Sequence, residues 1–193
     1  MYVCGITPYD ATHLGHAATY LHFDLIHRYL LATKASVKFV QNITDIDDPL
    51  LERAARDGVS WQDLAQSQID LFRSDMVNLH ILPPEHYIGV VEAMPLVTAA
   101  IDQLVSAGST YQIEEDTYFK VHADSDFGSR SHLSRAEMEM IFAERGGDPQ
   151  RTGKQDPLDA LLWRGQRPGE PHWNSTLGEG RPGWHIECCA IAL

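Results

Sequence analysis

The chain has 193 residues, of which 44% are hydrophobic and 22% charged, and its formal net charge at pH 7 is −12. No apolar run is long enough to span a membrane and no basic-then-apolar leader is visible, so we expect a cytoplasmic protein without a membrane partner. The acidic balance disfavours a nucleic-acid partner and fits small-molecule substrates better, because nucleic-acid surfaces are usually basic.

The first sixteen residues predict a strand, a loop and the start of a helix. Residues 2–6 are aromatic and β-branched, as in a short buried strand, and residues 7–12 form a polar loop. His13-Leu14-Gly15-His16 then opens a helical pattern that continues to residue 31. A helix N-terminus directly after a strand offers N–H groups and a positive dipole end to phosphate, so this stretch predicts a nucleotide site.

A second strand is expected over residues 36–40, with the polar run 42–48 at its carboxyl end. Strand, helix and strand within about forty residues form a βαβ unit with parallel strands. Polar residues at the carboxyl ends of neighbouring parallel strands are where open α/β sheets bind ligands. Asp45, Asp47 and Asp48 have the simpler interpretation of capping the helix that follows, and a Mg²⁺ or catalytic role for them is less favoured.

Three further helices follow from apolar spacing and from their caps. They are expected over residues 49–56, 61–79 and 90–105. Ser60 is a good N-cap, Gly58 and Gly108 fit helix ends, and Pro95 predicts a kink.

The character of the sequence changes after Gly108. Two short strands are expected over residues 110–113 and 117–121, and a short helix over 134–142. A buried strand is expected over 158–163, a loop over 166–182, and a helix over 184–193.

Cysteine and histidine are the residues with the most distinctive chemistry. Cys4, Cys188 and Cys189 form a poor disulfide framework, which leaves buried thiols or metal ligands as the interpretations. His13 and His16 lie three residues apart at a helix start, where they can stabilise the charge that develops during attack on the α-phosphorus of ATP. Zinc binding is the rival interpretation for the two histidines.

The motifs resemble those of a known family. His-x-Gly-His resembles the HIGH motif of class I aminoacyl-tRNA synthetases, and Tyr-Val-Cys-Gly-x-Thr-x-Tyr-Asp with Asn-Ile-Thr-Asp-Ile-Asp-Asp resembles their cysteinyl branch. Within that branch, the runs 15–20, 47–51 and 144–149 resemble the mycothiol-biosynthesis cysteine ligases, which join activated cysteine to an amino sugar. Ala18 and Pro49 stand where the synthetases usually carry arginine and lysine. The resemblance covers the whole chain.

This resemblance implies an α/β fold, with a class I synthetase Rossmann-like parallel sheet, helices on both faces and a connective insertion. Residues 1–108 would form the first half of the catalytic domain, 109–157 the insertion, and 158–193 the start of the second half. The family's KMSKS lysine loop and its third zinc ligand, a histidine, have no counterpart here, so we expect a chain truncated before that region.

The resemblance also implies the site residues. One Zn²⁺ per chain would be held by Cys4 and Cys188, with Cys189 as a packing residue. The residues expected around the cysteinyl-adenylate are Cys4, Gly5, Ile6, Thr7, Thr19, Asn42, Ile43, Thr44 and Trp184. ATP, with Mg²⁺, would contact His13, Gly15 and His16, of which His13 and His16 are the catalytic candidates. An acceptor-side motif would comprise Glu144, Arg145, Gly146, Gly147, Asp148 and Pro149.

The implied activity is ATP-dependent ligation of L-cysteine to the amine of glucosaminyl-inositol through cysteinyl-AMP, with release of AMP and pyrophosphate, by a monomer. The first alternative is a cysteinyl-tRNA synthetase. The second, from another class, is a non-catalytic fragment that binds a metal or a nucleotide.

Overall fold

Three parallel strands form the first sheet of the computed structural model, which describes residues 1–193. They are β1 (Tyr2–Val3), β2 (Val40–Ile43) and β3 (His86–Gly89), in the order β1-β2-β3. In the register of this sheet, Val3 pairs with Gln41, and Gln41 pairs with Tyr87. The predicted α/β class with a parallel sheet is therefore confirmed.

The predicted strand positions need correction. The first strand is shorter than expected, and β2 begins at Val40, where the prediction had it end. Polar residues follow Val40, and a pattern-based prediction assigns them to a loop. They lie in a strand because Asn42 is buried and satisfies its polar atoms with partners in the fold. Strand β3, which follows Pro83-Pro84, was not predicted.

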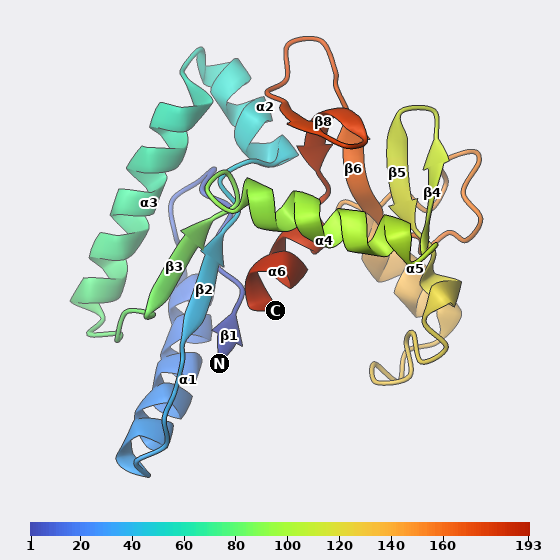
Figure 1. Cartoon of the computed structure of the whole chain (residues 1–193). Helices are drawn as coiled ribbons and strands as arrows, with labels where there is room; N and C mark the ends of the chain where they lie inside the picture. The colour runs from blue at the N-terminus through green and yellow to red at the C-terminus, as the bar shows by residue number, and fades with distance from the viewer. The chain divides into compact units, whose positions relative to one another are not determined.

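Helices α1 (Leu14–Ala32), α2 (Asp48–Asp57) and α3 (Trp61–Asn78) connect these strands. Their caps follow the expected chemistry. The side chain of Ser60 accepts a hydrogen bond from the N–H of Asp63, and Gly58 ends α2 with a φ of 66°. Tyr20 of α1 and Phe72 of α3 pack in one cluster with Val3 of β1. Figure 1 shows both helices beside the three-stranded sheet.

The core of this region is apolar. One cluster comprises Val3, Ile6, Tyr20, Phe39 and Phe72, all with less than a tenth of their surface exposed. A second cluster joins α2 to α3 through Leu50, Ala54, Leu64 and Ala65. Each large apolar side chain buried in this way stabilises the fold by about 1.5–3 kcal/mol.

The chain divides into two units, Met1–Met94 with Ile191–Leu193, and Pro95–Ala190. Helix α4 (Met94–Ser106) begins at the boundary. Two predictions for this helix were wrong: it starts at Met94 rather than at residue 90, and Pro95 lies in its first turn rather than at a kink. Gly108 has a φ of 69°, as expected after a helix end.

The second unit contains a five-stranded antiparallel sheet in the order β4-β5-β6-β8-β7. Its strands are β4 (Thr110–Ile113), β5 (Asp116–Phe119), β6 (Leu161–Gly165), β7 (Trp173–Ser175) and β8 (Gly178–Pro182). The hairpin of β4 and β5 confirms the two strands expected there, and β6 lies slightly later than the strand expected at 158–163. The domain boundaries implied by the resemblance stay predictions.

The loop expected over residues 166–182 was wrong, because β7 and β8 lie in it. Its glycines suggested irregular chain, but Gly180 is needed for strand pairing. A Cβ on Gly180 would lie 2.2 Å from the carbonyl oxygen of Arg164 and 2.6 Å from Nε1 of Trp163. The close approach of the backbones therefore explains the glycine.

A short 3₁₀ helix, η1 (Val121–Ala123), and the helices α5 (Arg135–Glu144) and α6 (Trp184–Ala192) complete the second unit. Ser134 caps α5 in a capping box with Glu137. No helix of the structure has both the length and the apolar character that crossing a membrane requires.

Buried carboxylates hold much of the second unit together. Asp116 is 2% exposed, and both of its carboxylate oxygens accept hydrogen bonds from Nη2 of Arg167, at 2.9 and 3.0 Å. It also accepts from the N–H of Gly165 at 3.0 Å. Arg151 also pairs with Asp116 at 2.9 Å. Asp159 accepts from the hydroxyl of Tyr111 at 2.7 Å. Charge-assisted bonds of this kind are stronger than neutral ones.

Candidate functional site

Asn42 organises the end of the first strand. Its Oδ1 accepts hydrogen bonds from the hydroxyl of Tyr2 at 3.0 Å and from the N–H of Gly5 at 2.9 Å. Its Nδ2 donates to the hydroxyl of Thr44 at 3.2 Å. One buried amide side chain thus fixes the backbone after β1 and the threonine after β2.

The chain after β1 approaches β2 too closely for a side chain at Gly5. A Cβ at that position would lie 1.6 Å from the carbonyl oxygen of Asn42. The N–H of Thr44 donates to the carbonyl of Ile6 at 2.9 Å, which extends the pairing beyond the strands. The structure therefore places Cys4, Gly5, Ile6 and Thr7 directly after β1, and Asn42, Ile43 and Thr44 at the carboxyl end of β2, whereas Thr19 lies on α1.

The loop over residues 7–12 is tied to two helices. The guanidinium of Arg53, on α2, donates to the carbonyl of Tyr9 and, at 3.0 Å, to the carboxylate of Asp10. The hydroxyl of Thr12 donates to the carboxylate of Asp75, on α3. These contacts fix the loop that precedes the histidines.

His13 and His16 cap the N-terminus of α1 by a reciprocal arrangement. The Nδ1 atom of His13 accepts from the N–H of Gly15 at 3.0 Å, and the Nδ1 atom of His16 accepts from the N–H of His13 at 3.2 Å. The two ring centroids lie 4.2 Å apart. Sequence reasoning had placed both histidines at the helix start but had not found that they replace the usual serine and glutamate of a capping box.

This geometry indicates which nitrogen of each ring carries the proton. A ring nitrogen that accepts a hydrogen bond carries no proton, so in the neutral ring the proton lies on Nε2, which becomes a donor. Burial and, after it, the neighbouring His13 lower the pKa of His16. His16 is therefore a neutral N–H donor at pH 7 rather than a cation.

Gly15 and Thr19 have roles within the helix itself. A Cβ on Gly15 would lie 2.8 Å from the His13 ring, so the glycine makes room for the capping histidine. The hydroxyl of Thr19 donates to the carbonyl of Gly15 at 3.0 Å. Their contacts with ATP and with the adenylate stay predictions.

The three aspartates after β2 have structural contacts. The carboxylate of Asp47 accepts from the N–H of Asp48 at 2.8 Å, at the N-cap of α2. Asp45 accepts from the N–H of Val91 at 3.0 Å, and burial raises the pKa of its carboxyl. The Asp47 contact agrees with the capping interpretation, whereas Asp45 binds the backbone after β3 and does not cap α2.

The two predicted zinc ligands lie in different units. Cys4 is exposed at the end of β1, and its carbonyl accepts from the hydroxyl of Tyr20 at 3.2 Å. Cys188 lies on α6 and is half-buried. The structure contains no group of three or more His, Cys, Asp and Glu side chains arranged to hold a metal. Two thiols are suitable zinc ligands chemically, but they do not make a complete site.

The helix that carries Cys188 begins with two stacked rings. The rings of Trp184 and His185 stack at 5.7 Å, and His185 stacks on Phe142 of α5 at 6.2 Å. Burial lowers the pKa of His185. Trp184 is 39% exposed, so it is not a core residue, and it shares a helix face with Cys188 four residues on.

Asp148, in the predicted acceptor-side motif, binds a buried lysine, Lys154. The carboxylate of Asp148 accepts from the hydroxyl of Tyr118 at 2.5 Å and from the ammonium of Lys154 at 3.0 Å. Lys154 also donates to the carbonyl of Pro157 at 2.8 Å, and its side chain is 2% exposed. Gly147 lies against the ring of Phe142. Asp148 thus has internal partners, whereas Glu144 and Arg145 are exposed.

Sequence reasoning missed Arg53, Asp75 and Lys154. Arg53 and Asp75 act through partners far away in the chain, Lys154 binds Asp148 six residues before it, and none of the three belongs to a recognisable motif. The one sequence signal that could have indicated such a contact is a polar residue on the apolar side of a helix. Asp75 is a weak example of it.

Comparison with known proteins adds the family. Residues 1–193 match the family model described as tRNA synthetases class I (C) catalytic domain. The chain is 61% identical over 193 residues to a protein of Thermomonospora curvata, 62% over 192 residues to one of Frankia casuarinae, and 60% over 194 residues to one of Streptomyces coelicolor. All three are named L-cysteine:1D-myo-inositol 2-amino-2-deoxy-alpha-D-glucopyranoside ligase.

These matches cover 100% of this chain but only 47%, 41% and 47% of the relatives, so the chain spans about half their length or less. Among solved structures, Mycobacterium tuberculosis methionyl-tRNA synthetase in complex with methionyl-adenylate matches with a TM-score of 0.63 and 18% identity, over 88% of this chain and 43% of that one. That likeness concerns the fold, and it confirms the predicted class I synthetase architecture.

Proposed function

Because the chain belongs to the family of class I (C) tRNA synthetase catalytic domains, we propose that it is the catalytic-domain part of an enzyme that ligates L-cysteine to the amine of glucosaminyl-inositol, in mycothiol biosynthesis. The observation that carries this proposal is the identity of 60% or more, over the whole chain, to proteins named as that ligase. The histidines that cap α1 and the residues held by Asn42 are the groups that would act on the substrates.

In the first step, a carboxylate oxygen of cysteine attacks the α-phosphorus of ATP and pyrophosphate leaves. The Nε2–H groups of His13 and His16 donate to the phosphate oxygens on which charge develops, and the N-terminus of α1 adds its positive dipole end. Mg²⁺ accompanies ATP in this proposal. Donors that are already held in place by the capping hydrogen bonds need no reorganisation during the reaction.

The ends of β1 and β2 would hold the amino acid. Gly5 allows the backbone to approach closely, and Asn42 and Thr44 are fixed by their mutual hydrogen bond. Cys4 and Cys188 are the residues that would hold Zn²⁺, together with a further ligand. When bound there, zinc selects the soft thiolate of cysteine over the hydroxyl of serine.

In the second step, the amine of the sugar attacks the carbonyl carbon of cysteinyl-AMP. The amide bond forms, AMP leaves with one of the two original carboxylate oxygens, and the amine loses a proton to solvent. The acceptor-side role of residues 144–149 is part of this proposal. Within it, exposed Glu144 and Arg145 are the better candidates for sugar contacts, because Asp148 has internal partners.

The rival of the same family is a cysteinyl-tRNA synthetase. The net charge of −12 and the ligase-type runs argue against it. The first unit offers no observation that favours the non-catalytic alternative. Its two histidines that cap α1 lie beside the strand ends.

The test compares acceptors. A polypeptide of the relatives' length that carries residues 1–193 is incubated with cysteine and ATP, and AMP is measured with glucosaminyl-inositol or with tRNA. We expect the amino sugar to drive AMP formation and tRNA to leave it at the background rate. Cysteinylation of tRNA at a comparable rate would favour the synthetase, and no cysteine-dependent AMP with either acceptor would favour the non-catalytic fragment.

A further inference from the structure

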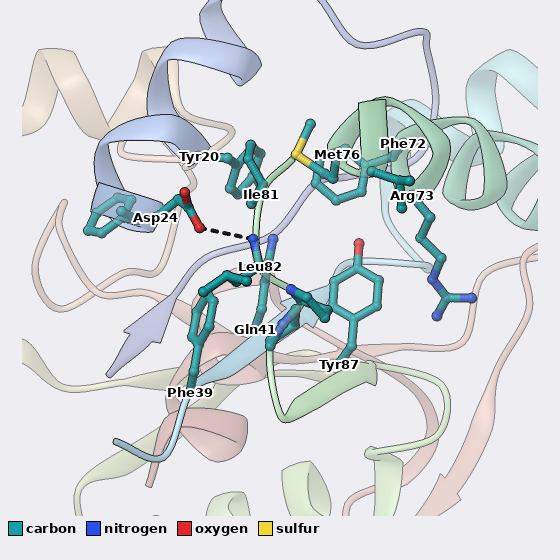
Figure 2. Close-up of a pocket in the computed structure, with 14 residues that line it drawn as sticks. Tyr20, Asp24, Phe39, Gln41, Phe72, Arg73, Met76, Ile81, Leu82 and Tyr87 are labelled. Carbon is teal, nitrogen blue, oxygen red and sulfur yellow. Dashed lines mark hydrogen bonds between the residues drawn. The ribbon is translucent and has the colours of Figure 1, made fainter. Parts of the chain in front are cut away.

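A cavity of about 350 Å³ lies in the first unit, between the sheet and the helices that cover one of its faces. Side chains of α1 and α3 line one side of it, and side chains of β2, β3 and the segment 81–84 line the other (Figure 2). Most of the wall is apolar and includes Phe39, Phe72 and Met76. The volume falls at the lower end of the range for small-molecule sites.

Two buried polar atoms in the wall lack partners. Gln41 is 4% exposed, and its Nε2 makes no hydrogen bond of ordinary geometry, although the Tyr20 hydroxyl lies close to this side chain. The hydroxyl of Tyr87 is also buried without a hydrogen bond. Gln41 and Tyr87 are paired residues of adjacent parallel strands, so their side chains leave the same face of the sheet side by side. Buried donors without a partner are rare in folded proteins and call for an explanation.

A closed apolar core does not explain these two residues. Leucine and phenylalanine would keep the shapes of Gln41 and Tyr87 without burying unpaired donors. Burial raises the pKa of Tyr87, so its hydroxyl keeps its proton. Amide and hydroxyl therefore both present N–H or O–H groups, and their natural partner is an acceptor oxygen.

The charged groups on the wall favour a neutral occupant. The carboxylate of Asp24 is already paired: it accepts from the N–H of Leu82 at 2.9 Å and from the guanidinium of Arg28 at 2.6 Å. Arg73 lies with its guanidinium 5.0 Å from the centre of the Tyr87 ring, stacked on it rather than aimed at the unpaired donors. An anion would lose its hydration without gaining a cation in direct contact.

We propose that this cavity is a binding site for a small, neutral and mainly apolar molecule that carries a carbonyl oxygen, which accepts hydrogen bonds from Gln41 and Tyr87. The site is separate from the adenylation site, because Asn42 points to the opposite face of the strand from Gln41. Tyr20 contacts both regions, since it lines the cavity and donates to the carbonyl of Cys4.

The first experiment uses two molecules of nearly the same shape, propiophenone and its hydrocarbon analogue n-propylbenzene. Binding is followed by NMR of ¹³C-labelled methionine methyl groups, because Met76 lines the cavity whereas Met138 and Met140 lie in the second unit. We expect propiophenone to shift the Met76 signal in a saturable way, with no change at Met138 or Met140. The hydrocarbon should bind about tenfold more weakly, as loss of one buried hydrogen bond predicts.

The second experiment removes the donors. Tyr87→Phe and Gln41→Leu should each weaken propiophenone binding by about tenfold, while the unfolding temperature of the unliganded protein stays equal or rises. Tyr29→Phe and Gln66→Leu delete the same groups at exposed positions of α1 and α3 and should change neither value. An absent Met76 shift, equal binding of the hydrocarbon, or wild-type binding by both cavity variants would overturn the proposal.

Discussion

The two units of the chain are stabilised in different ways. The first is built around apolar clusters beneath a parallel sheet, and its buried Asn42 and Thr44 fix the backbone near the strand ends. The second uses buried carboxylates, among them Asp116 and Asp159, that bind arginine, tyrosine and backbone N–H groups. Buried polar side chains therefore have different structural roles in the two units.

This difference guides the interpretation of motifs. In the first unit, the contacts of His13, His16 and Asn42 fix the backbone around the proposed site for a nucleotide and an amino acid. In the second unit, Asp148 belongs to a conspicuous motif, yet its carboxylate is engaged by Tyr118 and Lys154. Asp148 therefore has a structural role in the second unit.

The largest expected effect concerns the proposed zinc binding, which needs one cysteine from each unit. In the full-length enzyme, Cys4→Ala or Cys188→Ala should remove bound zinc and abolish cysteine activation, because each deletes a soft ligand of the proposed site. Metal content is measured by atomic emission, and activation by ATP–pyrophosphate exchange. Cys189→Ser is the control and should keep the metal. Equal zinc in all three variants would show that the ligand assignment is wrong.

The second prediction concerns Asp116, the buried carboxylate of the second unit that pairs with two arginines. Asp116→Ala leaves Arg167 and Arg151 without their buried partner and should lower the free energy of unfolding by about 3–5 kcal/mol, measured in urea. Glu114→Gln is the matched control. Glu114 also pairs with Arg151, but it is 81% exposed, and its change should stay within about 1 kcal/mol. Similar losses for the two variants would contradict the contrast between the units.

The third prediction concerns the capping histidines of the first unit. His16→Ala removes one phosphate donor and should lower the rate of pyrophosphate exchange by about 100-fold, with little effect on cysteine affinity. Loss of the cap contributes to stability separately, so unfolding in urea is measured on the same variant. A wild-type exchange rate would remove His16 from the proposed mechanism.

The same residue predicts a pH dependence. The pKa of His16 is lowered in the folded protein, so the unfolded chain takes up the proton first as pH falls. The contribution of the neutral ring to stability is complete above about pH 6.5, its ordinary value, and is lost as pH falls through the lower folded value. Compared with wild type, His16→Ala should show a smaller decrease of stability over this acidic range, and an unchanged profile would count against the neutral donor.

The smallest expected effect concerns the loop before the histidines. Arg53→Lys replaces the planar guanidinium that joins Tyr9 and Asp10, so the KM for ATP should rise by about fivefold, as for a net loss of about 1 kcal/mol. Arg56→Lys on the same helix is the control, because Arg56 is exposed and pairs with Asp57 outside this loop. An equal KM for both variants would mean that the tie does not position the loop.

The sequence predicted the strand, loop and helix at the N-terminus because local signals and the function agree there. The residues of His-Leu-Gly-His also cap their own helix, and Ser60 and Gly58 have ordinary cap chemistry. The sequence failed at β3, β7 and β8, which depend on pairing with distant strands rather than on apolar alternation. It also missed Arg53 and Asp75, since both act on a loop far away in the chain.

The central claim, that cysteine is activated as an adenylate and then passed to an amine, is tested most directly with oxygen isotopes. The full-length enzyme is given L-cysteine with ¹⁸O in both carboxylate positions, ATP and glucosaminyl-inositol, and the products are analysed by mass spectrometry. Our account predicts one ¹⁸O in AMP and one in the amide product, with none in pyrophosphate. AMP without ¹⁸O, formed together with the amide, would contradict activation through cysteinyl-AMP.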